Sequence, residues 1–337
     1  MKNPLVSVIV PNYNYARYLA ERLDSVLGQT FRDFEVIILD DCSTDDSRDV
    51  IGRYAGHPQV SRVVFNETNS GNPFVQWEKG LGLAKGKYVW IAEADDCAEP
   101  TFLERTVAVM ESDDSIAVVK TMSRLIDSEG QPSPHKPFED FEPDGDAYVY
   151  DGSEYLQEKM IWWNHCYNAS MVLMRRDAWC QIHNKSYVRL RYVGDWLFWG
   201  MLMNGRRVAE IHEPLSRFRL HGNSVTDGAR QTPRLRAEGE IVAYMFRNML
   251  PGLPFGLKVY NRYNLYRIFH RGGLAGFRRE LESIDPKFWD NIGITSVSYP
   301  LFWLYKHTIW LVEKRFVSSR QAALRPVNII HGVDFTK

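Results

Sequence analysis

Three acidic residues have the strongest chemical potential in this sequence. Glu93, Asp95 and Asp96 fall within four positions of one another, where the apolar run that begins at Val89 ends. Carboxylates crowded in this way repel one another, and a hard divalent cation relieves the repulsion. We therefore predict a Mg²⁺ or Mn²⁺ site that holds a phosphate group. The alternative is that the acids only end a strand and cap the helix expected after Pro100.

A second acidic pair follows another apolar run. Asp40 and Asp41 come directly after Phe34–Leu39, and the next helix is predicted to begin near Ser43 or Thr44. In a parallel α/β sheet the carboxyl ends of the strands share one edge, and ligands bind in the crevice there. We therefore expect both acidic clusters to face one crevice.

Strands and helices alternate along the first third of the chain. Short apolar runs separated by amphipathic stretches of about ten residues are typical of a doubly wound, Rossmann-like, mostly parallel sheet flanked by helices. The predicted fold class is therefore α/β. The predicted strands are Leu5–Val10, Phe34–Leu39, Val60–Phe65 and Tyr88–Ala92, and the predicted helices are Tyr15–Leu27, Thr44–Tyr54, one that ends at Ala84, and Thr101–Met110.

The composition is that of a soluble globular protein. Hydrophobic residues make up 45% of the 337 residues and charged residues 25%, which excludes a disordered chain. The four cysteines have no C-x-x-C spacing, so we expect reduced thiols and a cytoplasmic location. The apolar run at the N-terminus is too short for a signal peptide, and no stretch reaches the roughly 18 apolar residues of a membrane-spanning helix.

Two later regions differ in composition from the rest. Between Asp127 and Tyr150 the residues are mostly Pro, Asp, Glu, Ser and Gly, which predicts a mobile loop. From Pro251 onward, 13 Lys and Arg residues stand against 6 Asp and Glu residues, interspersed with aromatic residues. Such segments suit helices on the surface of an anionic membrane at its inner face, or helices that pack on the main domain. Nucleic acid is disfavoured as a partner because no recognition motif accompanies the charge.

The order of motifs resembles the family 2 glycosyltransferases. The chain has Pro-Asn-Tyr-Asn at 11–14 after its first strand, a Gln-Thr-Phe turn at 29–31, and an Asp-Asp-x-Ser-x-Asp motif at 40–45. A Gly-Leu-x-x-Ala-x-Gly-x-Tyr motif at 80–88 leads to Glu93-Ala94-Asp95, where the family has Asp-x-Asp. The resemblance covers Val6–Met110 closely and Asn168–Thr226 more loosely. It implies a GT-A fold with a nucleotide-sugar-binding half at 1–120, an acceptor half at 121–228, and a mainly helical C-terminal extension at 229–337.

The resemblance also implies roles on the donor side. Asp95 would hold the metal ion, Asp40 or Asp41 would hydrogen-bond the base, and Tyr13 would stack on it. The other donor-binding residues expected are Pro11, Asn12, Asn69, Glu93 and Ala94. Glu93 departs from the usual Asp, and its longer side chain would reach the ribose or a metal-bound water. Glu78 and Trp77 also depart from the pattern, which puts phosphate binding by their helix in doubt.

On the acceptor side, Asp195 corresponds to the second acid of a two-acid motif whose first position here is Gly194. A carboxylate beside Trp196 and other rings would be desolvated, which favours a role as general base. Residues 207–226 are predicted to form a strand, a Pro turn and a second short strand that ends in an Arg-x-His segment. By resemblance, His221 of this segment, with Arg219, would ligate the metal or contact the diphosphate. Residues expected on the acceptor side are Trp163, Asn164, His165 and Trp196, although core packing explains the tryptophans equally well.

The sequence thus predicts a metal-dependent inverting glycosyltransferase. It would transfer one sugar from a nucleotide-diphosphate sugar, with UDP-sugars favoured, to a saccharide or lipid-linked saccharide of polysaccharide biosynthesis in the cell envelope. Two alternatives stay open: a sugar nucleotidyltransferase, and a decayed GT-A protein that binds without catalysis. The first would need a Gly-rich phosphate loop, which residues 11–14 do not supply.

Overall fold

A computed structural model describes residues 3–135, 138, 142–222, 233–250, 299–308 and 324–331. In its N-terminal part strands and helices alternate along the chain, as the apolar periodicity predicts. The elements in this part are β1 (Val6–Asn12), α1 (Ala16–Leu27), β2 (Phe34–Asp40), α2 (Ser47–Tyr54), β3 (Val60–Phe65), α3 (Pro73–Leu83), β4 (Tyr88–Ile91), β5 (Cys97–Ala98) and α4 (Phe102–Ser112).

The second part mixes longer strands with short helices. It contains β6 (Ile116–Ile126), β7 (Ala147–Asp151), α5 (Gly152–Tyr155), the π-helix η1 (Leu156–Met160), the 3₁₀ helix η2 (Ala169–Met171), β8 (Val172–Arg175), α6 (Arg176–Cys180), the 3₁₀ helix η3 (Ser186–Arg189), α7 (Gly194–Met203) and β9 (Arg207–Arg219). The described C-terminal elements are α9 (Pro233–Met249), α13 (Tyr299–His307) and β10 (Asn328–Ile330).

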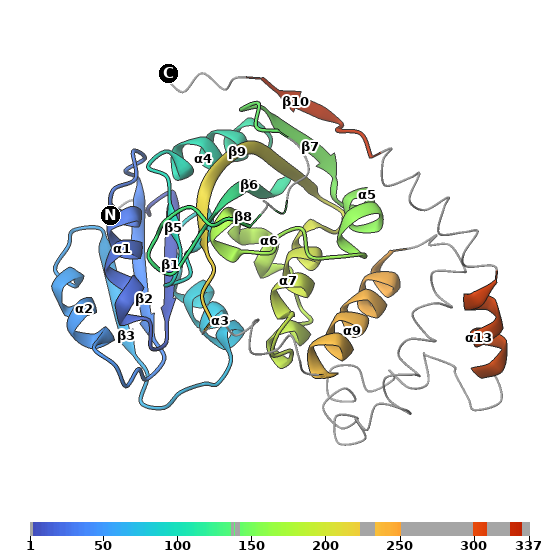
Figure 1. Cartoon of the computed structure of the whole chain (residues 1–337). Coiled ribbons are helices and arrows are strands. Elements are labelled where there is room, and N and C mark those ends of the chain that lie inside the picture. The colour runs from blue at the N-terminus through green and yellow to red at the C-terminus, as the bar shows by residue number, and fades with distance from the viewer. Residues whose placement is uncertain are drawn as a thin grey trace.

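One sheet runs through both parts (Figure 1). Its strand order is β10-β7-β9-β6-β8-β4-β1-β2-β3, and β5 pairs with β9 at one side. The four strands β4, β1, β2 and β3 are parallel, as predicted, whereas the other part combines parallel and antiparallel pairs. The boundary predicted between residues 120 and 121 lies inside β6, so the two predicted halves share this sheet.

Helices cover both faces of the sheet. Side chains of α1, α2 and α4 share one buried apolar cluster with one face of the strands. Side chains of α3, α7 and α9 share the other, which lies against the opposite face. Because the central strands are covered on both sides, they are almost entirely apolar, which is the pattern expected for buried parallel strands.

Three segments differ from the sequence prediction. Residues 207–221 were predicted as two strands separated by a Pro turn, but β9 continues through Pro214, where its pairing with β6 is irregular. A bulge of this kind accommodates the missing N–H of proline without ending the strand. The region predicted as a mobile loop contributes β7 to the sheet, and β10 adds an unpredicted strand from the C-terminal extension.

Little of the basic, aromatic C-terminal region lies within the described residues. The described part includes α13, in which Leu301, Trp303 and Leu304 are exposed. No helix among the described residues is both long and apolar enough to span a bilayer. Contact of this region with a membrane surface stays a prediction.

Candidate active site

The two acidic clusters lie at the same edge of the sheet. β1 pairs in parallel with β2 on one side, where Asn12 is opposite Asp40, and with β4 on the other. The chain leaves β4 through Ala92, whose N–H donates to the carbonyl of Ile9 at 2.8 Å. The turn that contains Glu93 therefore follows the carboxyl end of β4, beside the carboxyl ends of β1 and β2.

Asp40 connects the ends of β1 and β2. One carboxylate oxygen accepts the side-chain amide of Asn12 at 2.8 Å, and the other accepts the N–H of Ser43 at 3.0 Å. Asn14 and Cys42 in these turns have φ of 59° and 63°, a left-handed conformation that Asn adopts more readily than most residues. Asp40 is fully buried, so its visible role is to fix the two turns against each other.

Asp41 organises the polar turn at residues 66–72. Its carboxylate accepts hydrogen bonds from Asn66 at 2.7 Å, from the N–H and hydroxyl of Ser70, and from Gln76 at 2.8 Å. These four donors fill the acceptor capacity of a carboxylate. Asn69, in the same turn, is exposed, and its side chain accepts the N–H of Gly71.

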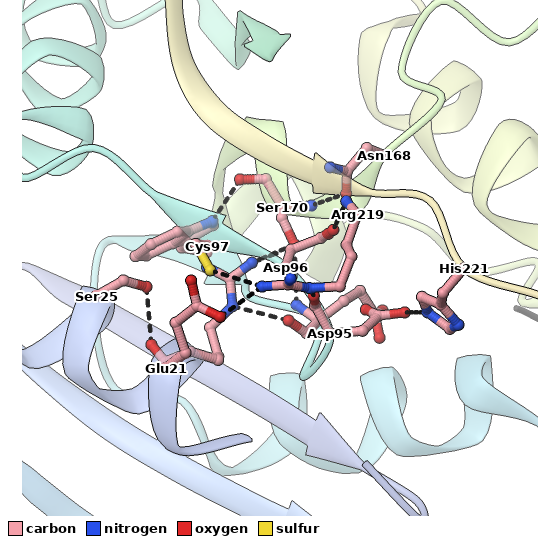
Figure 2. Close-up of polar contacts among 12 residues, drawn as sticks. Glu21, Ser25, Asp95, Asp96, Cys97, Asn168, Ser170, Arg219 and His221 are labelled. Carbon is pink, nitrogen blue, oxygen red and sulfur yellow. Dashed lines mark hydrogen bonds and ion pairs between the residues drawn. The ribbon is translucent and has the colours of Figure 1, made fainter. Parts of the chain in front are cut away.

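Two buried arginines, Arg22 and Arg219, hold the acidic turn that follows β4, and Figure 2 labels Arg219 beside Asp95 and Asp96. Arg22 on α1 donates to the carbonyl of Glu93 at 2.8 Å, and its guanidinium lies 3.9 Å from the carboxylate of Asp96. Arg219 at the end of β9 donates its side chain to the carbonyl of Asp95 at 2.7 Å and its backbone N–H to Asp96 at 2.9 Å. Burial, together with the charge of Asp95, raises the pKa of Asp96 to about 7.

Arg219 points into the protein and not toward the crevice. Its remaining guanidinium nitrogens contact Glu21 at 2.6 Å and the carbonyl of Asp127 at 3.1 Å. The side chain is almost completely buried and stacks over Tyr18. These contacts give Arg219 a structural part in the site, because it joins α1, the acidic turn and the turn after β6.

Asp95, which is partly exposed, pairs with the buried His221. The Asp95 carboxylate lies 2.9 Å from Nε2 of His221, and 18% of the Asp95 side chain is exposed (Figure 2). The His221 ring packs against Tyr15 and Tyr18, and its buried Nδ1 has no hydrogen-bond partner among the described residues. A carboxylate and an imidazole this close are suitable ligands for one Mn²⁺ or Mg²⁺ ion.

The described residues do not form a complete metal cage. No group of three or more His, Cys, Asp or Glu side chains is arranged among them to hold a metal ion. Mg²⁺-type ions are usually held by one or two protein carboxylates together with phosphate oxygens and water. The pair of Asp95 and His221 therefore fits a metal ion that binds with a phosphorylated ligand and not without it.

Glu93 is directed toward Trp77. Its carboxylate accepts the indole N–H of Trp77 at 2.8 Å, and its backbone N–H donates to Ser170 at 3.0 Å. Burial, with the charge of Asp95 next, raises the pKa of Glu93 to about 8. Ala94, the residue between the two acids, is buried. The other departure, Glu78, accepts hydrogen bonds from Trp179 at 2.7 Å and from Tyr187 and pairs with Lys185, so it belongs to the packing of α3.

Tyr13 is an exposed aromatic residue beside the carboxyl ends of β1 and β2. It follows the end of β1, and 45% of its surface is exposed. Pro11 and Asn12, by contrast, are buried within β1. A free ring at the carboxyl edge of the sheet is available for stacking on a ligand.

Asp195 lies in the first turn of α7, where helix N–H groups favour a negative charge. Its carboxylate accepts the side-chain amide of Asn164 at 2.7 Å. Burial raises the pKa of Asp195 to about 7, against the opposing effect of the Trp196 N–H and Asn164. The preceding Gly194 has no room for a side chain, because a Cβ there would lie 2.5 Å from the Phe74 ring and from the Tyr187 carbonyl oxygen.

Four rings, two of them exposed and two partly buried, lie near the segment that carries Asn164. Trp163 and Phe138 are 41% and 42% exposed, and their rings lie 5.6 Å apart. Tyr167 lies 4.5 Å from Phe138 and 5.9 Å from Phe218. We call these four residues the aromatic platform. The predicted acceptor residue Trp163 belongs to it, whereas Trp196 is used in packing, since its indole N–H donates to the Met160 carbonyl at 2.7 Å.

His165 lies between the platform and a buried ion-pair cluster. Lys120 and Lys159 both contact the carboxylate of Glu210 at 3.0 Å, and Lys120 also donates to the His165 carbonyl at 3.2 Å. Burial and the two lysines lower the pKa of His165 to about 3. The imidazole is therefore neutral at physiological pH and offers both a donor and an acceptor.

Sequence reasoning missed several residues that shape the site. Arg22 and Ser170 support the acidic turn, and Asn164 was proposed as a sugar ligand but contacts Asp195. The one available signal was the arginine at position 22 in an otherwise apolar helix face. Its partners lie 71 or more positions away, so its role could not be predicted from local pattern.

Comparisons with known proteins place this chain in a family and a fold. The family model described as "Glycosyl transferase family 2" matches residues 7–180. TuaG of Bacillus subtilis, a protein assigned as a teichuronic acid biosynthesis glycosyltransferase, is 30% identical over 223 residues, which are 66% of this chain and 82% of that protein.

Two solved structures share the fold over most of their length. The structure of S. aureus TarS 1–349 in complex with UDP-GlcNAc covers 96% of this chain and 93% of that chain, with 18% identity and a TM-score of 0.60. The mannosyltransferase PcManGT from Pyrobaculum calidifontis, in complex with GDP-Man and Mn²⁺, covers 96% and 86%, with 17% identity and a TM-score of 0.51. These likenesses confirm the predicted fold class.

The support of the acidic turn by Arg22 can be tested through stability. Arg22→Met leaves the buried Asp96 without its nearest counter-charge, and we expect a loss of about 3–5 kcal/mol in the free energy of unfolding. Arg17→Met, on the same helix, removes an exposed side chain that pairs with Glu129, and we expect little change. Urea denaturation measures both. Equal, small losses in the two variants would contradict the role assigned to Arg22.

Proposed function

Because the chain belongs to glycosyl transferase family 2 and is a glycosyltransferase, we propose that it moves a single sugar from a nucleotide-diphosphate sugar to a saccharide acceptor, with Asp195 as the general base. The observation that carries the proposal is the contrast between two carboxylates. Asp95 is partly exposed beside His221 at the carboxyl edge of the sheet, whereas Asp195 is desolvated beside an exposed aromatic surface. One suits charge neutralisation and the other suits proton transfer.

The donor binds across the carboxyl ends of β1, β2 and β4. Tyr13 stacks on the base, and Asn12 and Asp40 fix the turn beneath it. Asp41 holds the turn that contains Asn69, so both acids of the pair shape the pocket, and a direct hydrogen bond of Asp40 or Asp41 to the base stays a prediction. A UDP-sugar is favoured as donor. TarS with UDP-GlcNAc and PcManGT with GDP-Man share this fold, which supports a nucleotide-sugar in the same crevice.

Asp95 and His221 would hold a Mn²⁺ or Mg²⁺ ion together with the diphosphate. When bound, the ion neutralises the negative charge that grows on the departing nucleoside diphosphate. Arg22 and Arg219 keep the turn around Asp95 in place from beneath, because both donate to its backbone carbonyls. The Mn²⁺ in the PcManGT complex supports the assignment.

Asp195 accepts the proton of the acceptor hydroxyl. The hydroxyl oxygen attacks the anomeric carbon as the bond to the diphosphate breaks, so a single displacement inverts the configuration at that carbon. A base with a pKa near 7 is about half ionised at neutral pH, and its carboxylate form is basic enough to take a proton in the transition state. Asn164 orients this carboxylate through its side-chain amide.

The acceptor lies on the aromatic platform. Aromatic faces complement the apolar C–H faces of sugar rings, and the rings of Trp163 and Phe138 are free to make this contact. His165 and Asn164, on the same segment, add hydrogen-bonding groups close to Asp195. The acceptor is a saccharide of envelope polysaccharide biosynthesis, lipid-linked if the C-terminal region contacts the inner membrane face from the cytoplasm. Kinship with TuaG supports the pathway class.

The structure does not favour the alternative of a GT-A protein that binds its ligand without catalysis. This alternative was based on the departures at Glu93, Glu78 and Gly194. Each of these has a packing or hydrogen-bonding reason in the fold, and none of them removes Asp95, His221 or Asp195. A nucleotidyltransferase has no supporting observation.

Donor binding is expected to depend on both the metal ion and Asp95. A ligand at about 100 times its Kd stabilises the folded protein by about 2.7 kcal/mol, which raises the melting temperature. In a thermal-shift screen of UDP-, GDP-, dTDP- and CMP-sugars with and without Mn²⁺, we expect a UDP-sugar with Mn²⁺ to give the largest shift. Asp95→Asn should lose the Mn²⁺-dependent part. An equal shift in EDTA and Mn²⁺ would rule out the metal site.

Turnover is expected to follow the ionisation of Asp195. Since only the carboxylate accepts a proton, kcat/KM should rise as pH increases through about 7 and then level off. Asp195→Asn should lower kcat about 10²- to 10⁴-fold and abolish this dependence, with the donor-induced thermal shift intact. The control is Asp177→Asn on the surface of α6, which should keep the wild-type profile. Wild-type turnover by Asp195→Asn would eliminate the assigned base.

The aromatic platform is expected to affect the acceptor alone. Trp163→Ala should raise KM for a short soluble acceptor about tenfold, because a stacked ring is lost, and leave KM for the donor unchanged. Trp303→Ala on α13 removes an equally exposed indole elsewhere and serves as the control. A rise in donor KM, or no change in acceptor KM, would contradict the proposed acceptor surface.

A further inference from the structure

A buried glutamate from the C-terminal extension supports the segment that leads to Asp195. Glu238 lies on α9 and is completely buried. Both of its carboxylate oxygens lie 3.1 Å from the N–H of Arg191, and one accepts the N–H of Tyr192 at 2.8 Å. Arg234, one turn earlier on α9, donates to the same carboxylate at 2.9 Å.

These two N–H groups belong to the short link between η3 and α7. The link begins after Arg189 and ends at Gly194, so it sets where α7 starts and where Asp195 points. Both N–H groups donate to a carboxylate that is completely buried, and a donor left without a partner in such a place costs about 1–3 kcal/mol. A side chain 46 or more positions further along the chain thus holds the backbone just before Asp195.

Further contacts join α9 to α7. The ring of Phe246 lies 6.2 Å from that of Trp196, the residue after Asp195. A Cβ on Gly200 would lie 2.2 Å from Phe246, so this glycine allows the close approach of the two helices. Gly194 has no space for a side chain either. The start of α7 is therefore held by contacts to the backbone.

We propose that Glu238 is a positioning residue for glycosyl transfer, which fixes the Arg191–Tyr192 backbone and thereby holds Asp195 at the acceptor hydroxyl. The inference rests on the proposed role of Asp195 as the base. It gives the C-terminal extension a part in catalysis that does not depend on a membrane.

The charge of Glu238 raises the pKa of Asp195, as burial does. A neighbouring negative charge disfavours the ionised form of Asp195, and Glu238 contributes in this way to its raised pKa. The thiol of Cys166 also interacts with Asp195, but burial raises the pKa of this thiol to about 12, so it is uncharged at working pH. Asn164 is neutral, and Arg234 partly compensates Glu238 from its own helix.

Two variants separate the position of the backbone from the charge. Glu238→Gln keeps an oxygen that accepts a backbone N–H but removes the charge. We expect the acidic limb of the kcat/KM profile to move to lower pH, with most of kcat retained at high pH. Glu238→Ala removes both, and we expect kcat to fall about 10- to 100-fold, since small misplacements of a catalytic group have effects of this size. KM for the donor should change in neither variant.

The controls distinguish a catalytic effect from unfolding. Asp49→Asn removes an exposed charge from α2, on the opposite face of the sheet, and should leave the pH profile unchanged. The donor-induced thermal shift confirms that each Glu238 variant is folded. If Glu238→Ala does not fold, Glu238→Gln alone tests the proposal. A shift of its acidic limb to lower pH supports the positioning role, and an unchanged limb contradicts it.

The outcomes also separate this inference from the proposed function. Wild-type kcat and pH profile in both Glu238 variants, with Asp195→Asn inactive, would overturn the positioning role alone. An active Asp195→Asn enzyme would overturn the base and this inference together. A loss of kcat that only matches the fraction of unfolded protein would also overturn the positioning role.

Discussion

The site depends on keeping three carboxylates together in a turn that is largely out of water. Their burial, and after it their mutual repulsion, raise the pKa values of Glu93 and Asp96. Arg22 and Arg219 offset part of this cost, and they reach the turn from α1 and from the end of β9. The geometry of four consecutive residues is thus fixed by two cations almost two hundred positions apart. Burial of those arginines requires the helices and strands around them to be in place first.

The two acidic clusters differ in how far their carboxylates are exposed to the crevice. Asp40 and Asp41 are buried, and their oxygens are occupied by groups of the protein itself, so this corner is rigid before any ligand binds. Asp95 keeps part of its carboxylate exposed beside His221. A rigid corner suits recognition of a planar base, because little side-chain entropy is lost on binding. A more open corner suits an ion that brings phosphate and water ligands with it.

Local pattern was enough to predict the N-terminal α/β part of the fold. The boundaries of β1, α1, β2 and β3 fall within two residues of those predicted, because buried parallel strands and amphipathic helices have clear periods. The prediction was wrong at Pro214, since a proline in an irregular pairing with β6 does not end the strand. It also missed β7 and β10, whose pairing depends on strands far away in sequence. Residues that act on backbone groups, such as Arg22 and Glu238, give no local signal of their partners.

Glu93 and Trp77 both depart from the family motif, but together they form a single hydrogen bond. By comparison with the family motif, Trp77 stands where a basic residue is often found. Glu93 stands where the metal motif usually has the shorter Asp. In the fold the indole N–H of Trp77 is buried beside the turn and needs an acceptor, and the carboxylate of Glu93 supplies it at 2.8 Å. The two changes are therefore halves of one hydrogen bond. Because this bond uses Glu93 inside the protein, the outward side of the turn is left to Asp95 and His221, and the metal site we propose needs no third acid.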